Sequence, residues 1–175
     1  MSVGLLLALA AAPPGPGPVR LIQCRMMECD WSRRVSNRIV RTTPRGRLRQ
    51  YVAWQGRSIH RDSLYPVRYA GSLPIRWGKR PATDYVFCAR AQPALAFRAD
   101  GRWIAHALDL FHLAGYQEPS ATTYLLACHG RYGLAPGPER GRALRRLGYR
   151  PGTRSEQVSI DRPEALVALP ARPND

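Results

Sequence analysis

The chain has 175 residues, which is room for one domain and excludes a second domain of similar size. Its hydrophobic content of 45% is ordinary for a globular protein, while 16 prolines and 15 glycines favour short elements and many turns. The formal net charge is +15, and no segment approaches the roughly 20 apolar residues that a transmembrane helix needs.

The first 18 residues resemble an export leader followed by a spacer. A short apolar run from Leu5 to Ala12 ends in small residues, and Ala8 and Ala10 form an A-x-A pattern for signal peptidase. Proline and glycine then alternate through residues 13–18, which predicts a stiff linker. We therefore expect an exported protein, periplasmic or extracellular, with residues 1–18 outside the folded domain.

Positive charge is concentrated in the first half of the chain. Fifteen cations lie between Arg20 and Arg80 against three acids, whereas residues 81–130 hold three arginines and four acids. An even coding bias toward arginine does not leave the middle of the chain neutral. Either the basic part carries a face that meets an anionic partner, or the middle part of the chain mainly forms the core and has little surface.

Four cysteines form an even set, which in an exported chain predicts disulfides. The close spacing of Cys24 and Cys29 favours a bond between them, which leaves Cys88 to pair with Cys128. A rival interpretation takes Cys24, Met26, Met27 and Cys29 as soft sulfur ligands of Cu(I) in a periplasmic copper binder. Disulfides are favoured because the Cu(I) pattern is unspecific, so we expect no metal and no cofactor.

Short runs rich in β-branched and aromatic residues predict two hairpins. The runs 35–43 and 48–55 flank the turn residues Pro44 and Gly46, and Gly56 is expected to break the second strand. The runs 94–98 and 102–108 flank a loop that ends in Gly101, and residues 84–89 predict a further strand in the same sheet.

Helical patterns follow the strands. Ser120 as a cap and Gly130 as a stop predict a helix over residues 121–129, and residues 137–149 favour one more short helix. We expect an α+β fold, a small antiparallel β-sheet domain with a minor helix, stapled by disulfides. The domain covers residues 19–150, and residues 151–175 are expected to form a polar, flexible tail.

No known catalytic motif is present, and the sequence resembles no family. The enzyme alternative is a small secreted ribonuclease or phosphodiesterase, in which His60 and His106 act as acid and base beside an arginine.

The leading hypothesis is a non-catalytic basic protein that binds an anionic envelope polymer or an acidic protein, ahead of nucleic acid. Arg45, Arg47 and Arg49 are the candidate binding residues, because they cluster at a predicted hairpin turn where side chains reach solvent.

Overall fold

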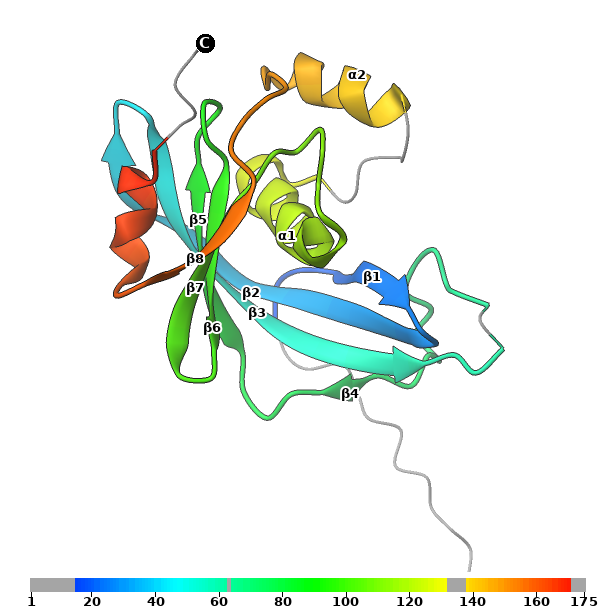
Figure 1. Ribbon diagram of the computed structural model, residues 1–175. Coiled ribbons are helices and arrows are strands. Elements are labelled where there is room, and N and C mark those ends of the chain that lie inside the picture. Colours follow the sequence, from blue (N-terminus) through cyan, green and yellow to red (C-terminus); the bar gives the residue numbers. More distant parts are fainter. Residues whose placement is uncertain (1–14, 63, 132–137, 171–175) are drawn as a thin grey trace, which may run out of the picture.

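The computed structural model describes residues 15–62, 64–131 and 138–170. This part of the chain is mostly one antiparallel sheet with short helices, in the strand order β1-β2-β3-β5-β6-β7-β8, and β4 pairs with β3 beside this path (Figure 1). The strands are β1 (Val19–Arg25), β2 (Glu28–Thr43), β3 (Gly46–Ile59), β4 (Arg76–Trp77), β5 (Ala82–Cys88), β6 (Ala94–Ala99), β7 (Arg102–Ala107) and β8 (Glu156–Ile160).

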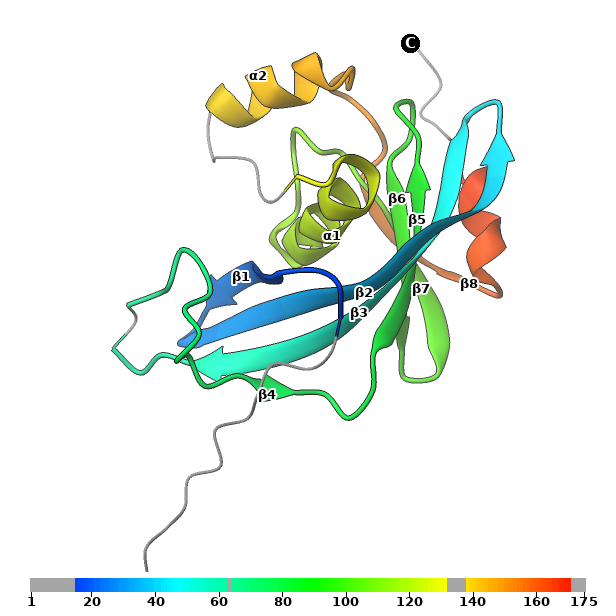
Figure 2. The same ribbon diagram turned by 180° about the vertical axis from the view of Figure 1, so that it is seen from behind.

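The hairpin of β2 and β3 contains the two longest strands of the sheet. Its turn consists of Pro44 and Arg45, and Gly46 begins β3, so the hairpin turns where the sequence predicts. The strands run the length of the molecule with a strong bend (Figure 2). The register of β2 shifts between Arg34 and Ser36 and again between Ile39 and Arg41. Extra residues of this kind increase local twist, so the two irregularities account for the bend.

Gly56 does not break β3, contrary to the expectation from the sequence. It pairs with Trp31 of β2 and Trp77 of β4 in the middle of a ladder. A Cβ at this position would lie 2.5 Å from Cγ2 of Ile75 and 2.7 Å from the Trp77 ring. The glycine therefore lets the chain pack closely against β3, which is a common reason for glycine inside a strand.

The hairpin of β6 and β7 forms where it is predicted. Its loop consists of Asp100 and Gly101, both at positive φ (49° and 77°), which is the backbone that a tight two-residue hairpin loop requires. Upstream, β5 pairs with β6, so the predicted strand at residues 84–89 belongs to this sheet.

The helices are α1 (Glu118–His129), α2 (Pro138–Arg146) and the 3-10 helices η1 (Gly115–Gln117) and η2 (Pro163–Ala168). Helix α1 begins three residues earlier than predicted, because Pro119 occupies its first turn and Gln117 is the residue at the N-cap. Ser120 is therefore inside the helix rather than capping it. Gly130 ends the helix in the left-handed conformation, as expected.

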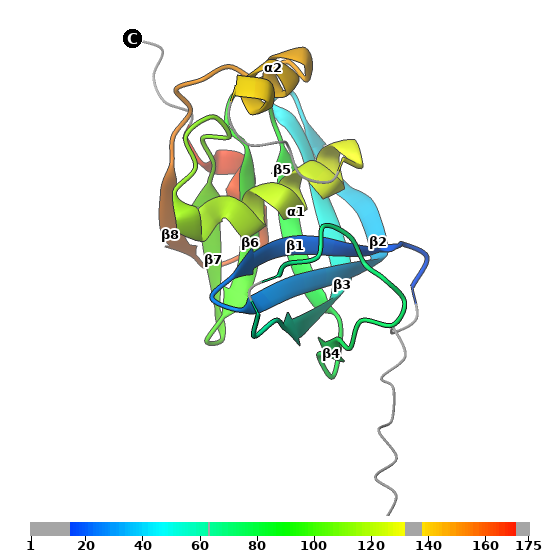
Figure 3. The ribbon, with the colours of Figure 1, turned by 90° about the vertical axis from the view of Figure 1, so that its right-hand side faces the viewer.

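Helix α1 covers one face of the sheet (Figure 3). Tyr124 and Leu125 of α1 pack there against Tyr51, Val86 and Leu95, which come from three neighbouring strands. The disulfide between Cys88 of β5 and Cys128 of α1 fastens the helix to the same face.

The opposite face is covered by the segment that the sequence predicts to be a flexible tail. Residues 156–160 form β8 beside β7, and residues 163–168 form η2, whose Leu166 is fully buried against Leu48 and Phe87. The prediction of a flexible tail is wrong for residues 156–168. The few apolar residues of this stretch pack against strands that are distant in sequence.

The second disulfide joins Cys24 to Cys29, so the cysteines pair as the sequence favours. Cys24 and Cys29 are direct partners across the β1–β2 hairpin. Two such bonds are typical of proteins that fold in an oxidising compartment. In the described ranges no helix is long and apolar enough to span a membrane.

Candidate functional site

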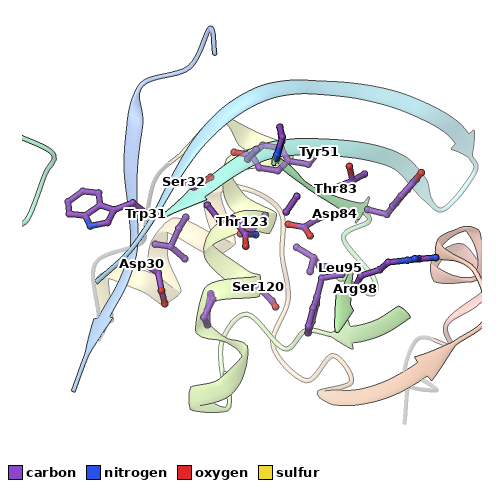
Figure 4. Close-up of a pocket in the computed structure, with 18 of the residues that line it drawn as sticks. Asp30, Trp31, Ser32, Tyr51, Thr83, Asp84, Leu95, Arg98, Ser120 and Thr123 are labelled. Carbon is purple, nitrogen blue, oxygen red and sulfur yellow. The ribbon is translucent and has the colours of Figure 1, made fainter. Parts of the chain in front are cut away.

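A cavity of about 850 Å³ lies between α1 and the sheet (Figure 4). Its walls come from β1, β2, β3, β5, β6 and β7 and from the first turns of α1. Cavities of this size suit small organic ligands. The residues that give it chemical character are Ser32, Tyr51, Asp84, His106, Ser120 and Thr123.

Asp84 is the most unusual residue of the cavity. It lies on β5 opposite Tyr51 of β3, and its side chain projects toward α1 (Figure 4). Only 8% of its surface is exposed, and its carboxyl group has no hydrogen bond or ion pair with the described residues. Burial raises its pKa to about 7, because a carboxylate loses its hydration there without gaining a partner.

His106 of β7 lines the same cavity and is held at both ring nitrogens. Its Nδ1 lies 2.8 Å from Oγ of Ser120, and its Nε2 lies 2.8 Å from Oε1 of Gln157. An amide oxygen only accepts, so Nε2 carries the proton and Nδ1 accepts from the Ser120 hydroxyl. Burial lowers the pKa of His106, although the bond to Gln157 opposes this shift. The imidazole is therefore neutral near pH 7.

Three arginines adjoin the cavity, but two of them are engaged elsewhere. The guanidinium of Arg98 lies over the Trp103 ring and points away from the cavity (Figure 4). Arg57 forms ion pairs with Glu28 and Asp30 at 3.2 and 3.4 Å. Arg80 lies exposed at the rim and has no ion pair in the part of the chain that the structure describes.

His60 and His106, the histidines proposed for nuclease chemistry, are not brought together. His60 follows the end of β3 and contacts Ser58 and Tyr65, near the cluster built around Trp31. It does not line the cavity that holds His106. The two-histidine site expected for a ribonuclease-like enzyme is therefore not formed by these residues.

A second candidate region is the part of the β2–β3 hairpin from the middle of β2 through the turn, residues 34–49, named here the basic hairpin end. It contains six arginines and no acidic residue. Among the described residues, none of the six forms an ion pair with a carboxylate. They are Arg34, Arg38, Arg41, Arg45, Arg47 and Arg49.

Of the three candidate binding arginines, only Arg47 is exposed and without a side-chain bond to another described residue. Arg45 is exposed, but it donates to the carbonyl oxygens of Val167 and Leu169 at 3.0 and 2.8 Å. Arg49 is half-buried and donates from Nε to Oδ1 of Asn37 at 2.8 Å. Burial, and then the charge of Arg47, lowers the pKa of Arg49. Two of the three therefore help to hold the fold.

The proposed Cu(I) ligands do not form a metal site in this structure. Cys24 and Cys29 are oxidised to a disulfide, which removes the thiolates that Cu(I) prefers. Met26 and Met27 are exposed at the hairpin turn. Among residues 15–62, 64–131 and 138–170, no cluster of histidine, cysteine and acidic side chains suits a metal ion.

Asp84 and Ser120 were not singled out from the sequence as site residues. A signal for Asp84 was present, since it is the one charged residue in the strand ATDYVFC and shares a face with Val86. Ser120 carried no such signal, because a serine before a helical pattern predicts a cap.

Comparisons with known proteins identify no relative of this chain. No family model, no curated protein and no solved structure matches it. The cavity and the basic hairpin end are therefore the features of this chain that bear on its function.

Proposed function

We propose that the protein is an exported, non-catalytic binding protein that attaches to an anionic component of the cell envelope through the basic hairpin end. One observation carries this proposal. Six arginines gather within 16 residues at the end of one hairpin, and no described carboxylate neutralises any of them.

Several arginines elsewhere in the protein do form ion pairs with carboxylates. Arg140 pairs with Glu118, Arg142 with Glu139 and Arg154 with Glu156. The contrast supports a role for the uncompensated charge, because clustered like charges destabilise a fold unless something else neutralises them.

The surface chemistry favours phosphate or carboxylate groups on the partner. A guanidinium binds either group through two parallel hydrogen bonds, which favours arginine over lysine for such recognition. The strand also exposes Ile39 and Val40 between Arg38 and Arg41. An anionic polymer with some apolar surface, or an acidic protein, fits this combination.

Export is part of the proposal. The apolar leader pattern at residues 5–12 supports it, and the two disulfides are typical of an oxidising compartment. A phosphate-rich or carboxylate-rich envelope polymer is the anionic surface that an exported protein meets first.

The test is binding to immobilised polyphosphate and polyglutamate across a salt titration. The variant Arg34→Gln/Arg41→Gln/Arg47→Gln removes three exposed arginines that make no side-chain bond with described residues. The matched control, Arg102→Gln/Arg146→Gln/Arg162→Gln, removes the same charge from exposed positions elsewhere.

We expect the hairpin variant to bind at least tenfold more weakly than wild type, and the control to change little. Binding should weaken as salt rises, because screening acts over about 8 Å at physiological ionic strength. Equal losses in both variants would show a general effect of net charge and contradict a dedicated surface. Tighter binding to single-stranded RNA than to either polymer would reassign the partner to nucleic acid.

A further inference from the structure

We propose that the cavity between α1 and the sheet binds a small molecule with a protonated amine at one end and an anionic group at the other, as in a short peptide. Asp84 receives the amine and Arg80 meets the anion. None of the six arginines of the basic hairpin end lines this cavity, and the proposal does not depend on the function proposed for them.

The carboxyl group of Asp84 is accessible from the cavity even though the residue is buried. In the described part of the chain, every fully buried side-chain nitrogen or oxygen has a hydrogen-bond partner. Asp84 has none among these residues, so the small part of it that stays exposed includes its carboxyl oxygens. Since Asp84 lines the cavity, these oxygens face the space that a ligand would occupy (Figure 4).

A protonated amine is the group that this carboxyl lacks. A buried carboxylate without a partner is costly, and a cation that also hydrogen-bonds removes most of the cost. An ammonium group has three donors. Beside Asp84, the cavity offers the hydroxyl oxygens of Ser120 and Thr123 as further acceptors. The Ser120 hydroxyl donates its own proton to His106, which leaves its lone pairs free to accept.

An uncharged His106 is compatible with a protonated amine in the cavity. A protonated imidazole on the wall would repel an ammonium group, but burial lowers the pKa of His106 and keeps it uncharged near neutral pH. Its ring is fixed by Ser120 and Gln157 and flanked by Phe97 and Tyr116. We infer that His106 orients Ser120 and does not contact charge directly.

Arg80 supplies a complementary charge for the far end of the ligand. It lies at the rim, four residues before Asp84, which corresponds to roughly 13 Å of extended chain. Arg98 points away and Arg57 is paired with acids, so neither is available in the same way. A molecule about as long as a tripeptide would join Asp84 to Arg80 and fit within the cavity of about 850 Å³.

The probes are trialanine, its N-acetyl form and its C-terminal amide, each titrated calorimetrically into the protein at pH 7.5, where the α-amino group is mostly protonated. We expect trialanine to bind, N-acetyl-trialanine to bind at least tenfold more weakly, and the amide to lose affinity by a smaller factor. The substitution Asp84→Asn should abolish the preference for the free amine, and Arg80→Gln should abolish the preference for the free carboxylate.

Affinity for trialanine should fall between pH 7.5 and pH 5.5 in wild type, because protonation removes the negative charge of Asp84, whose pKa is about 7. The peptide amine is mostly charged over this range, so its own titration changes the affinity less. The Asp84→Asn protein should lack this dependence, and near-ultraviolet circular dichroism shows whether it keeps its fold. The variant Arg41→Gln/Arg47→Gln leaves out Arg34, whose charge acts on Tyr51 of the cavity wall. It should bind trialanine as wild type does, so the two proposals fail or succeed separately.

Three results would overturn the proposal. They are no binding of trialanine at millimolar concentration, equal binding of trialanine and its N-acetyl form, and unchanged binding by folded Asp84→Asn protein. Equal binding of both peptides with an intact effect of Asp84→Asn would point instead to a neutral hydrogen-bonding ligand.

Discussion

Asp84 of β5 lies directly across from Tyr51 of β3, so a carboxyl group and a phenol share one wall of the cavity between sheet and helix. Burial is the largest cause of the raised pKa of Tyr51, and the negative charge of Asp84 raises this pKa further. The same burial raises the pKa of Asp84 to about 7. Both groups therefore favour their neutral forms.

The substitution Asp84→Asn should stabilise the protein at alkaline pH. The native pKa of about 7 lies above the ordinary value of 3.8 for an aspartate, so the native state holds this proton more tightly than the unfolded chain. This contribution to stability is complete below pH 3.8 and is lost as pH rises through 7. At pH 8 the variant escapes a penalty of up to about 4 kcal/mol.

Urea unfolding of wild type and Asp84→Asn between pH 4.5 and pH 8 measures this difference. The advantage of the variant over wild type should grow with pH, and Asp161→Asn, at an exposed position, is the control for removing one carboxyl group elsewhere. A variant that is less stable than wild type at pH 8 would contradict an unpaired, buried carboxylate.

His106 should become protonated only at a lower pH than an ordinary histidine, and its neutral ring should carry the proton on Nε2. The bond to the Gln157 amide oxygen requires a proton on Nε2, and desolvation lowers the pKa of the ring. Side-chain nitrogen chemical shifts in a pH titration report both properties. A proton on Nδ1 at neutral pH would show that the Ser120 and Gln157 contacts are wrongly placed.

Loss of the Cys88–Cys128 disulfide should destabilise the protein more than loss of Cys24–Cys29. The first closes a long loop and ties α1 to the sheet, while the second spans only a hairpin turn. The chain-entropy model gives about 4 kcal/mol for the long loop and about 2 kcal/mol for the short one. Denaturant unfolding of the two Cys→Ala double variants compares them, and a larger loss for the hairpin pair would reverse this ranking.

The turn between β1 and β2 should be improved by substitution. Met26 and Met27 occupy its two central positions at φ of 50° and 64°, a conformation that suits asparagine and glycine. Both side chains are exposed, at 85% and 48%, so little packing is lost when they are replaced. Met26→Asn/Met27→Gly should stabilise the protein by about 1–2 kcal/mol.

Thermal unfolding with both disulfides intact measures the effect of the turn substitution. The control Met26→Ala/Met27→Ala keeps the unfavourable backbone and should give no gain. A stabilisation of equal size in the alanine control would attribute the effect to loss of the methionines rather than to the turn.

Several features of the fold follow from local sequence patterns. The turn at Pro44 and Gly46, the tight loop at Asp100 and Gly101 and the helix stop at Gly130 each depend on the backbone preferences of those residues. The short spacing of Cys24 and Cys29 likewise favoured the observed bond. Such features are encoded within a few residues, so the sequence alone determines them.

Other features were decided by contacts between distant segments. The polar stretch at residues 156–168 becomes β8 and η2 only because β7 and the buried face around Leu48 and Phe87 receive it. Gly56 stays in its strand because Ile75 and Trp77 pack over it. No local pattern reports such partners.

The candidate sites also combine features that the sequence determines with features that only the tertiary structure decides. The sequence by itself determined the gathering of arginines without acids at residues 34–49, since charge is a property of composition. Only the tertiary structure decided that Arg45 and Arg49 are engaged in the fold and that Asp84, His106 and Ser120 share one cavity. Burial and hydrogen-bond geometry depend on which strands and helices meet, and these set the chemistry of an ionisable group.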